Sequence, residues 1–138
     1  MEFGGINYIA VVVAAVAAFA FGVVFYMTLA KPWMAAVGKT EEDMEAERRN
    51  PRPYITAIVS QLIMAWVLAG VVGHLGTGQV TVANGLISGA FVWFGFIVTS
   101  MVVNHGFQGA KASLTLIDSG HWLGVLLVQG LVIGLFGV

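Results

Sequence analysis

Three polar residues, Asp118, His121 and Gln129, interrupt a long apolar stretch near the end of the chain. On a helix that turns about 100° per residue, His121 lies about 60° and Gln129 about 20° from Asp118, so the three form a polar stripe on one face. A carboxylate beside an imidazole is suited to proton or cation handling, because histidine titrates near neutral pH. This stripe is the strongest candidate for chemistry in the sequence.

Four further polar residues lie at the end of the preceding apolar stretch: Thr99, Ser100, Asn104 and His105. Only a short connection joins the two stretches, which predicts a tight antiparallel hairpin. We therefore expect Asp118 to lie level with Thr99 or Ser100. The side chains of Asn104 and His105 are then expected nearby.

Two roles of Asp118 are compatible with this arrangement. As a proton or cation site, it would act with His121 or His105 as its partner. As a structural clamp, it would accept hydrogen bonds from Ser100, Thr99 or the amides that begin its own helix. An acid in a membrane span costs about 2.5–3.5 kcal/mol at the bilayer centre, so either role must offset that cost. We favour the clamp, because transporters typically have more polar residues at the midplane and broken helices in paired halves.

The elements that position these residues follow from composition. Of 138 residues, 59% are hydrophobic and 9% charged, against about 25% charged in soluble domains. Four apolar stretches, at 1.5 Å per helical residue, are long enough to cross a hydrocarbon core of about 30 Å. We predict a single all-α membrane domain over residues 1–138. Its transmembrane helices are expected at residues 6–29, 54–75, 82–103 and 113–137.

A charged loop at residues 31–53 separates the first two spans, where Tyr26 and Trp33 are expected as aromatic anchors at the membrane interface. Thr40 can cap a short surface helix over residues 41–49, which starts with acids and ends with arginines, as the helix dipole favours. Acidic and basic residues balance in this loop. We therefore favour a solvated connector over a docking surface for a partner or for anionic lipid.

Rows of small residues predict close helix packing. A glycine ridge on the last span lies opposite the polar stripe, so this helix is expected to contact neighbours on both sides. One of these two faces is expected to form a homo-oligomer contact, most simply in a dimer or trimer. The small residues are Ala10, Ala14, Ala18 and Gly22 in the first span, Gly85 and Gly89 in the third, and Gly120, Gly124, Gly130 and Gly134 in the fourth.

The second span has one strongly polar side chain, Gln61, within a row of small residues. A glutamine in this setting usually faces a neighbouring helix and forms a hydrogen bond worth about 1 kcal/mol or less. We expect Gln61 to face such a neighbour.

The positive charges predict the orientation in the membrane. Lysine and arginine in short loops remain cytoplasmic. All six lie either between spans one and two or between spans three and four, which predicts both termini outside the cytoplasm. They are Lys31, Lys39, Arg48, Arg49, Arg52 and Lys111.

Several segments together resemble the bacterial family called "domain of unknown function 1761". The first are Asn7-Tyr8, Phe25-Tyr26, Lys31-Pro32-Trp33-Met34 and Gly38-Lys39-Thr40-Glu41-Glu42-Asp43. The last is Leu116-Ile117-Asp118-Ser119-Gly120-His121, which is similar to the family's last-helix motif. The resemblance implies a four-helix protein of the bacterial inner membrane, and it implies no activity.

Other functions are excluded or disfavoured by the sequence. A net charge of −1 provides no basic footprint for nucleic acid, and the chain has no cysteine. Motifs for nucleotide binding, serine hydrolysis or zinc proteolysis are absent, and the three histidines are scattered. We expect no enzyme activity, metal or cofactor. The leading hypothesis is a structural or accessory membrane protein, alone as a homo-oligomer or within a larger complex. The alternative is a small proton- or cation-linked transporter or channel using Asp118 and His121.

Overall fold

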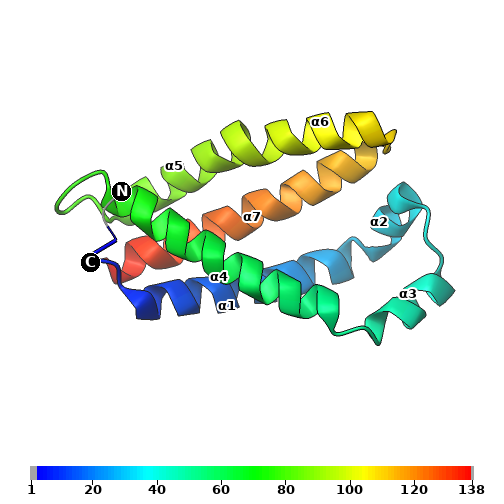
Figure 1. Ribbon diagram of the computed structural model, residues 1–138, viewed down its shortest axis with the longest axis horizontal. Helices are drawn as coiled ribbons and strands as arrows, with labels where there is room; N and C mark the ends of the chain where they lie inside the picture. Colours follow the sequence, from blue (N-terminus) through cyan, green and yellow to red (C-terminus); the bar gives the residue numbers. More distant parts are fainter. Residues whose placement is uncertain (1–2, 138) are drawn as a thin grey trace.

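Four long helical segments lie side by side in the computed structural model, which describes residues 3–137 (Figure 1). Each has the length and apolar composition of a membrane span. The prediction of an all-α membrane fold with four candidate spans is confirmed. The segments are α1 (Tyr8–Thr28), α4 (Arg52–Gly73), the continuous α5 (Val82–Val92), η1 (Trp93–Val98) and α6 (Thr99–Gln108), and α7 (Ala112–Phe136).

The last helix, α7, is the centre of the bundle. It packs against α5 along one side and against α1 along another, and α4 covers the seam between α1 and α7 (Figure 1). The segment α5–η1–α6 is the least buried of the four, with large exposed side chains such as Phe91, Phe94 and Phe96, as expected for a surface facing lipid. The buried core comes from the other three helices: Val11, Ala14, Ala15, Ala65, Leu68, Ala69, Val72, Leu126 and Ile133.

Small residues set the distance between α7 and its neighbours. A Cβ at Gly85 would collide with the carbonyl of Gly130, and a Cβ at Gly130 with that of Gly85. A Cβ at Gly89 would come within 2.7 Å of the Leu126 carbonyl, and one at Gly134 within 2.5 Å of the backbone of Thr81. The backbones of α5 and α7 are therefore in direct contact. The alanine row of α1 is buried as well: Ala10, Ala14, Ala18, and Gly22 after them.

The two faces of α7 that were expected to include an oligomer contact are both covered within the chain. Gly130 and Gly134 pack on α5, and the ring of Phe21 on α1 occupies the space beside Gly124. On the polar side, Gln129 is fully buried. Parts of both faces therefore already pack against other helices of the chain, and the expectation of a homo-oligomer contact stays a prediction.

The connector between α1 and α4 contains two short helices, α2 (Ala30–Val37) and α3 (Glu41–Arg48). The second agrees with the expected surface helix, and its capping box forms between Thr40 and Asp43. The first was not expected. It follows α1 after the single residue Leu29, and Pro32 lies in its first turn, where proline is tolerated. It ends at Gly38, whose φ of 77° is the left-handed conformation that glycine adopts readily.

We expect the capping box to make α3 sensitive to acid. The backbone amide of Thr40, and then its hydroxyl, donate to the Asp43 carboxylate and hold the pKa of Asp43 below its ordinary value. Because this pKa is lowered in the fold, the stabilisation is present above the pKa of an unfolded aspartate, about 3.9, and is lost as the pH falls through the lowered value. A carbon-13 titration of the Asp43 carboxyl should give a midpoint below about 3.9. In Thr40→Ala the midpoint should rise, and equal midpoints in both proteins would contradict the role of the cap.

The third segment is longer than expected. Its helix continues to Gln108, so Asn104 and His105 are helical and do not form the connection to α7. No proline interrupts it, and the left-handed Gly109, with a φ of 67°, ends it. Midway, η1 adopts the wider π-helical turn, and the indole of Trp93 donates a 2.7 Å hydrogen bond to the Ser119 carbonyl of α7.

Candidate functional site

Asp118 is held by two aromatic donors from the opposite end of the sequence. The hydroxyl of Tyr26 donates to its Oδ1 at 2.7 Å, and the indole Nε1 of Trp33 donates to the same oxygen at 3.1 Å. Tyr26 belongs to the last turns of α1 and Trp33 to α2. One carboxylate oxygen therefore ties α7 to both α1 and α2.

The break at Leu29 brings these two donors together. The chain leaves the α1 axis there, and α2 returns Trp33 towards the ring of Tyr26, with the two ring centroids 5.9 Å apart in an edge-to-face arrangement. The sequence indicated both residues only as interface anchors. One signal could have suggested the two hydrogen bonds. Tyr26 and Trp33 are expected at the same depth in the membrane as Asp118, and the hydroxyl of a tyrosine or the indole N–H of a tryptophan needs an acceptor there.

The residues expected to surround Asp118 make other contacts. The hydroxyls of Thr99 and Ser100 donate to carbonyls of their own helix, at 2.8 Å and 2.6 Å. His105 pairs with Thr115 at 2.8 Å, and Asn104 is exposed. The expectation that Thr99 or Ser100 would bind Asp118 is wrong. There are two reasons. Asp118 faces α1 and α2, whereas α6 lies on another side of α7. Serine and threonine hydroxyls in apolar surroundings also commonly donate to a carbonyl of their own helix.

His121, one turn further along α7, is enclosed by aromatic rings. Its ring centroid lies 4.8 Å from that of Tyr26 and 4.7 Å from that of Trp122, with Phe21 and Phe25 also in contact range. The side chain is 6% exposed, and its Nδ1 has no hydrogen-bond partner among the described residues.

Gly22 of α1 makes room for the imidazole of His121. A Cβ at Gly22 would lie 2.8 Å from Nε2. The backbone of α1 at Gly22 thus packs against the Nε2 edge of the imidazole. The second ring nitrogen, Nδ1, has no hydrogen-bond partner among the described residues. His121 is therefore a buried imidazole whose Nδ1 is enclosed and makes no hydrogen bond to the described residues.

Gln129 faces a different neighbour from Asp118. Its side-chain amide donates to the backbone carbonyl of Gln61 in α4 at 3.1 Å, and both side chains are buried. The Oε1 atoms of both glutamines lack a partner within residues 3–137. Gln61 does face a neighbouring helix, but its backbone makes the hydrogen bond there. The predicted stripe is accordingly divided between α1–α2 at one end and α4 nearer the middle.

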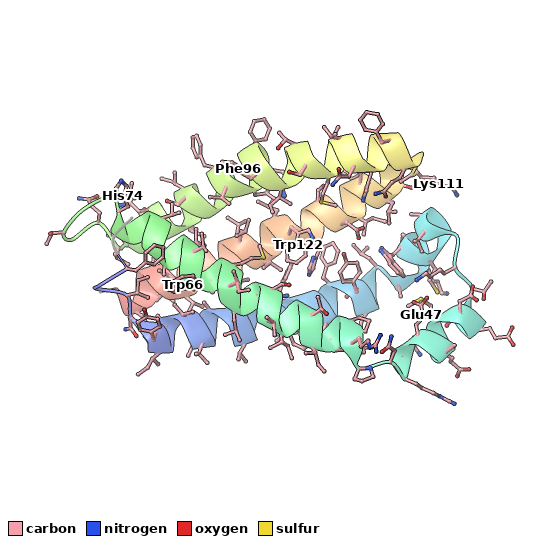
Figure 2. All side chains as sticks on the ribbon, viewed as in Figure 1. Glu47, Trp66, His74, Phe96, Lys111 and Trp122 are labelled. Atoms are coloured by element: carbon pink, nitrogen blue, oxygen red, sulfur yellow. The ribbon has the colours of Figure 1, made fainter. Side chains whose placement is uncertain are left out.

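A groove with a volume of about 530 Å³ connects several of these residues. Its side chains come from α1, α2, α3, α4 and α7, with Glu47 at the connector and Trp122 towards the middle of the bundle (Figure 2). His121 and Gln61 line it, whereas Asp118 is not part of its lining. We call this space the connector groove. Its walls include aromatic and methionine side chains together with three charged ones: Phe19, Tyr26, Trp33, Tyr54, Trp122, Met27, Met34 and Met44, and Glu41, Glu47 and Arg48.

A second cavity of about 330 Å³ lies at the end of the bundle that holds the chain termini (Figure 1). Its lining is rich in glycine, and its deepest side chains, Ala10, Ala69 and Ile133, are apolar. This second cavity offers no buried side-chain group that would orient a ligand.

The fold and the clamp at Asp118 define a multi-pass helical membrane protein with a polar cluster near one end of its bundle. The chain belongs to the family described as protein of unknown function (DUF1761), which matches residues 9–134. No curated protein and no solved structure matches it. The resemblance seen in the sequence is thereby confirmed, over nearly the whole chain.

Proposed function

We propose that this chain is a noncatalytic protein of the cytoplasmic membrane with a structural or accessory role, as a homo-oligomer or beside a larger complex. The observation that supports this proposal is the engagement of Asp118 by Tyr26 and Trp33. An acid within a membrane span is functional by default. Whether Asp118 is engaged in hydrogen bonds or accessible to an ion therefore distinguishes a structural role from a transporter.

A transported ion or proton needs access to the group that carries it. Asp118 has its Oδ1 occupied by two donors and lines neither of the two cavities. Its hydrogen bonds join three helices at the membrane edge, where α1 changes direction into α2. A carboxylate in this position acts as a clamp that holds the connector against α7.

Reconstituted liposomes test this role. With a pH gradient across the membrane and a pH-sensitive dye inside, liposomes with the wild-type protein should leak protons no faster than protein-free liposomes. The matched variant is Asp118→Asn, which keeps the size and an acceptor oxygen but removes the titratable charge. Proton flux in the wild type that disappears in this variant would overturn the structural proposal.

Assembly is the second part of the proposal. Native mass spectrometry from mild detergent should detect a dimer or trimer, or a co-purifying membrane subunit after capture from native membranes. A wild-type protein that remains monomeric and captures no partner would contradict it.

A proton- or cation-linked transporter is the second candidate, and His121 is the observation in its favour. This imidazole is buried, lines the connector groove and has an unpartnered nitrogen. In that case, His121→Gln would abolish the flux while Asp118→Asn would reduce it through the shared ring of Tyr26, which contacts both residues. A wild-type flux that is abolished in His121→Gln and reduced in Asp118→Asn would favour the transporter.

We further propose that both termini face away from the cytoplasm. The connector with α3 lies at one end of the bundle and the termini lie at the other (Figure 1), and Lys111 donates to the Ala35 carbonyl of α2. The positive charges are thus gathered at one end. In this cysteine-free chain, Thr77→Cys should react with an impermeant thiol reagent in intact cells, and Glu45→Cys should be protected. Reaction of Glu45→Cys alone would reverse the assignment.

A further inference from the structure

The surface helix α3 covers part of the connector groove with one of its faces. Glu41, Met44 and Arg48, spaced three and four residues apart, share that face and line the groove together with Glu47. Within Glu41–Arg48, all of which the structure describes, Met44 is half-buried and the other side chains are exposed. The helix therefore lies over the groove, and it adds nothing to the buried core found within residues 3–137.

Few contacts attach α3 to the bundle. It forms no extended packing contact with another helix of the described chain, and it lies outside the four long helices at the connector end (Figure 1). The connection before it contains Gly38, which is left-handed with a φ of 77°, and the connection after it contains Asn50 and Pro51. A segment with few buried apolar contacts opens more readily than a packed helix. The helix α3 is thus placed as a lid with a hinge on each side.

Lys39 joins this helix to the rest of the protein. Its ammonium nitrogen lies 2.7 Å from the Glu47 carboxylate of α3 and 5.7 Å from the ring centroid of Trp33 in α2. Glu47 lies on the side of α3 that faces α2 (Figure 2). The ring of Trp33 is itself held in place, because its indole donates a hydrogen bond to Asp118 of α7. One cation therefore connects α3 to a ring that is fixed on the bundle.

We propose that α3 is a hinged lid on the connector groove and that Lys39 is the latch that keeps this lid closed. In the closed state, Lys39 binds Glu47 beside the ring of Trp33, and Met44 is turned into the groove. When the charge of Lys39 is screened or removed, α3 moves away about its two connections. The side chains of the groove that α3 covers then become accessible to water.

The contacts of the latch are weak enough to open reversibly. The side chains of Lys39 and Glu47 are 32% and 50% exposed, so water and salt screen their attraction. An exposed ion pair and an exposed cation–π contact each change an equilibrium by up to about fivefold. We therefore expect the two contacts together to favour the closed lid by about three- to tenfold.

Thiol accessibility reports the position of the lid. The chain has no native cysteine, so Met44→Cys in lipid nanodiscs provides a single thiol on the face that lines the groove. Ala46→Cys is the matched reference, because this exposed position lies about 200° around the same helix and is accessible in both states. With an uncharged, water-soluble maleimide, Met44→Cys should react about three- to tenfold more slowly than Ala46→Cys. Equal rates would mean that the lid is not closed and would overturn the proposal.

Lysine substitutions test the latch in the Met44→Cys protein. Lys39→Met removes the cation but keeps a long side chain, and it should raise the reaction rate about three- to tenfold. Lys39→Arg retains the cation and should leave the rate unchanged. Lys31→Met removes the same charge from the same connector. Lys31 forms no ion pair among the described residues and does not line the groove, so its loss should have no effect. An unchanged rate in Lys39→Met, or an equal rise in Lys31→Met, would refute the latch.

Salt provides a test that leaves Lys39 in place. Raising the ionic strength from about 0.01 M to about 1 M shortens the screening length from about 30 Å to about 3 Å. The reaction rate of Met44→Cys, divided by that of Ala46→Cys under the same conditions, should then rise about two- to fivefold. In Lys39→Met the same ratio should not respond to salt. A ratio that is independent of salt in the protein with Lys39, or equally dependent on salt without it, would exclude Lys39 as an ionic latch.

Discussion

Replacing Gly130 with alanine is expected to lower the free energy of unfolding by about 2–3 kcal/mol, at the upper end of the usual cost of overpacking. The new Cβ would collide with the carbonyl of Gly85, and backbone cannot move aside as a flexible side chain can. The helices α5 and α7 would have to separate along their whole contact. Their association depends on close packing because lipid provides no hydrophobic force between helices.

Gly120→Ala is the matched control on the same helix. Its new Cβ would have the ring of Phe25 as nearest neighbour at 3.9 Å, an ordinary van der Waals contact. Both substitutions add one methyl group and improve helix propensity by about the same amount, up to about 1 kcal/mol. Reversible unfolding in mixed micelles should therefore show a large loss for Gly130→Ala and little change or a gain for Gly120→Ala. Equal stabilities would contradict the direct backbone contact between α5 and α7.

Asp118→Leu is the second substitution for which we expect a large effect. It removes both hydrogen bonds and leaves the Tyr26 hydroxyl and the Trp33 indole without an acceptor. Hydrogen bonds to a charged group contribute about 1.5–3 kcal/mol in soluble proteins, but those between membrane helices average about 0.6 kcal/mol. With two bonds lost and two donors unsatisfied, we expect a loss of about 2–3 kcal/mol. Asp118→Asn keeps an acceptor oxygen and should lose less than about 1 kcal/mol.

A double-mutant cycle with Tyr26→Phe assigns that loss to the clamp. Because Tyr26 and Asp118 share a hydrogen bond, Tyr26→Phe combined with Asp118→Leu should destabilise the protein by less than the sum of the single effects. Thr99→Val is the comparison, since the Thr99 hydroxyl bonds its own helix, and its effect should add independently. Additive effects of Tyr26→Phe and Asp118→Leu would mean that the clamp does not contribute to stability.

Much of the architecture could be predicted because it depends on local properties. The helices span a length set by the bilayer, and four apolar stretches separated by charge or glycine are sufficient to locate them. The cap of α3 was equally local, because Thr40 and Asp43 are three residues apart. The helix α2 was missed because it lies within the charged loop and contains Pro32, although proline in a first turn does not prevent a helix.

The faces of α7 were also accessible from sequence, since the angle between two residues on a helix depends only on their separation. This placed Asp118, His121 and Gln129 on one side and the glycine ridge on the other. It could not identify which helix covers each side. The hairpin between α6 and α7 suggested Thr99 and Ser100 as partners of Asp118, but adjacent helices in sequence need not provide the side chains opposite a given face.

The sequence by itself determined that the chain has four helices long and apolar enough to cross a membrane, that its charges gather at the connector, and that an acid within the last of these helices requires donors. Only the tertiary structure decided which donors these are. Tyr26 and Trp33 reach Asp118 because α1 lies against α7 and breaks at Leu29, so that two residues more than eighty positions away meet one carboxylate oxygen. The order in which helices surround α7 results from the packing of all four at once. No local pattern of residues specifies that order.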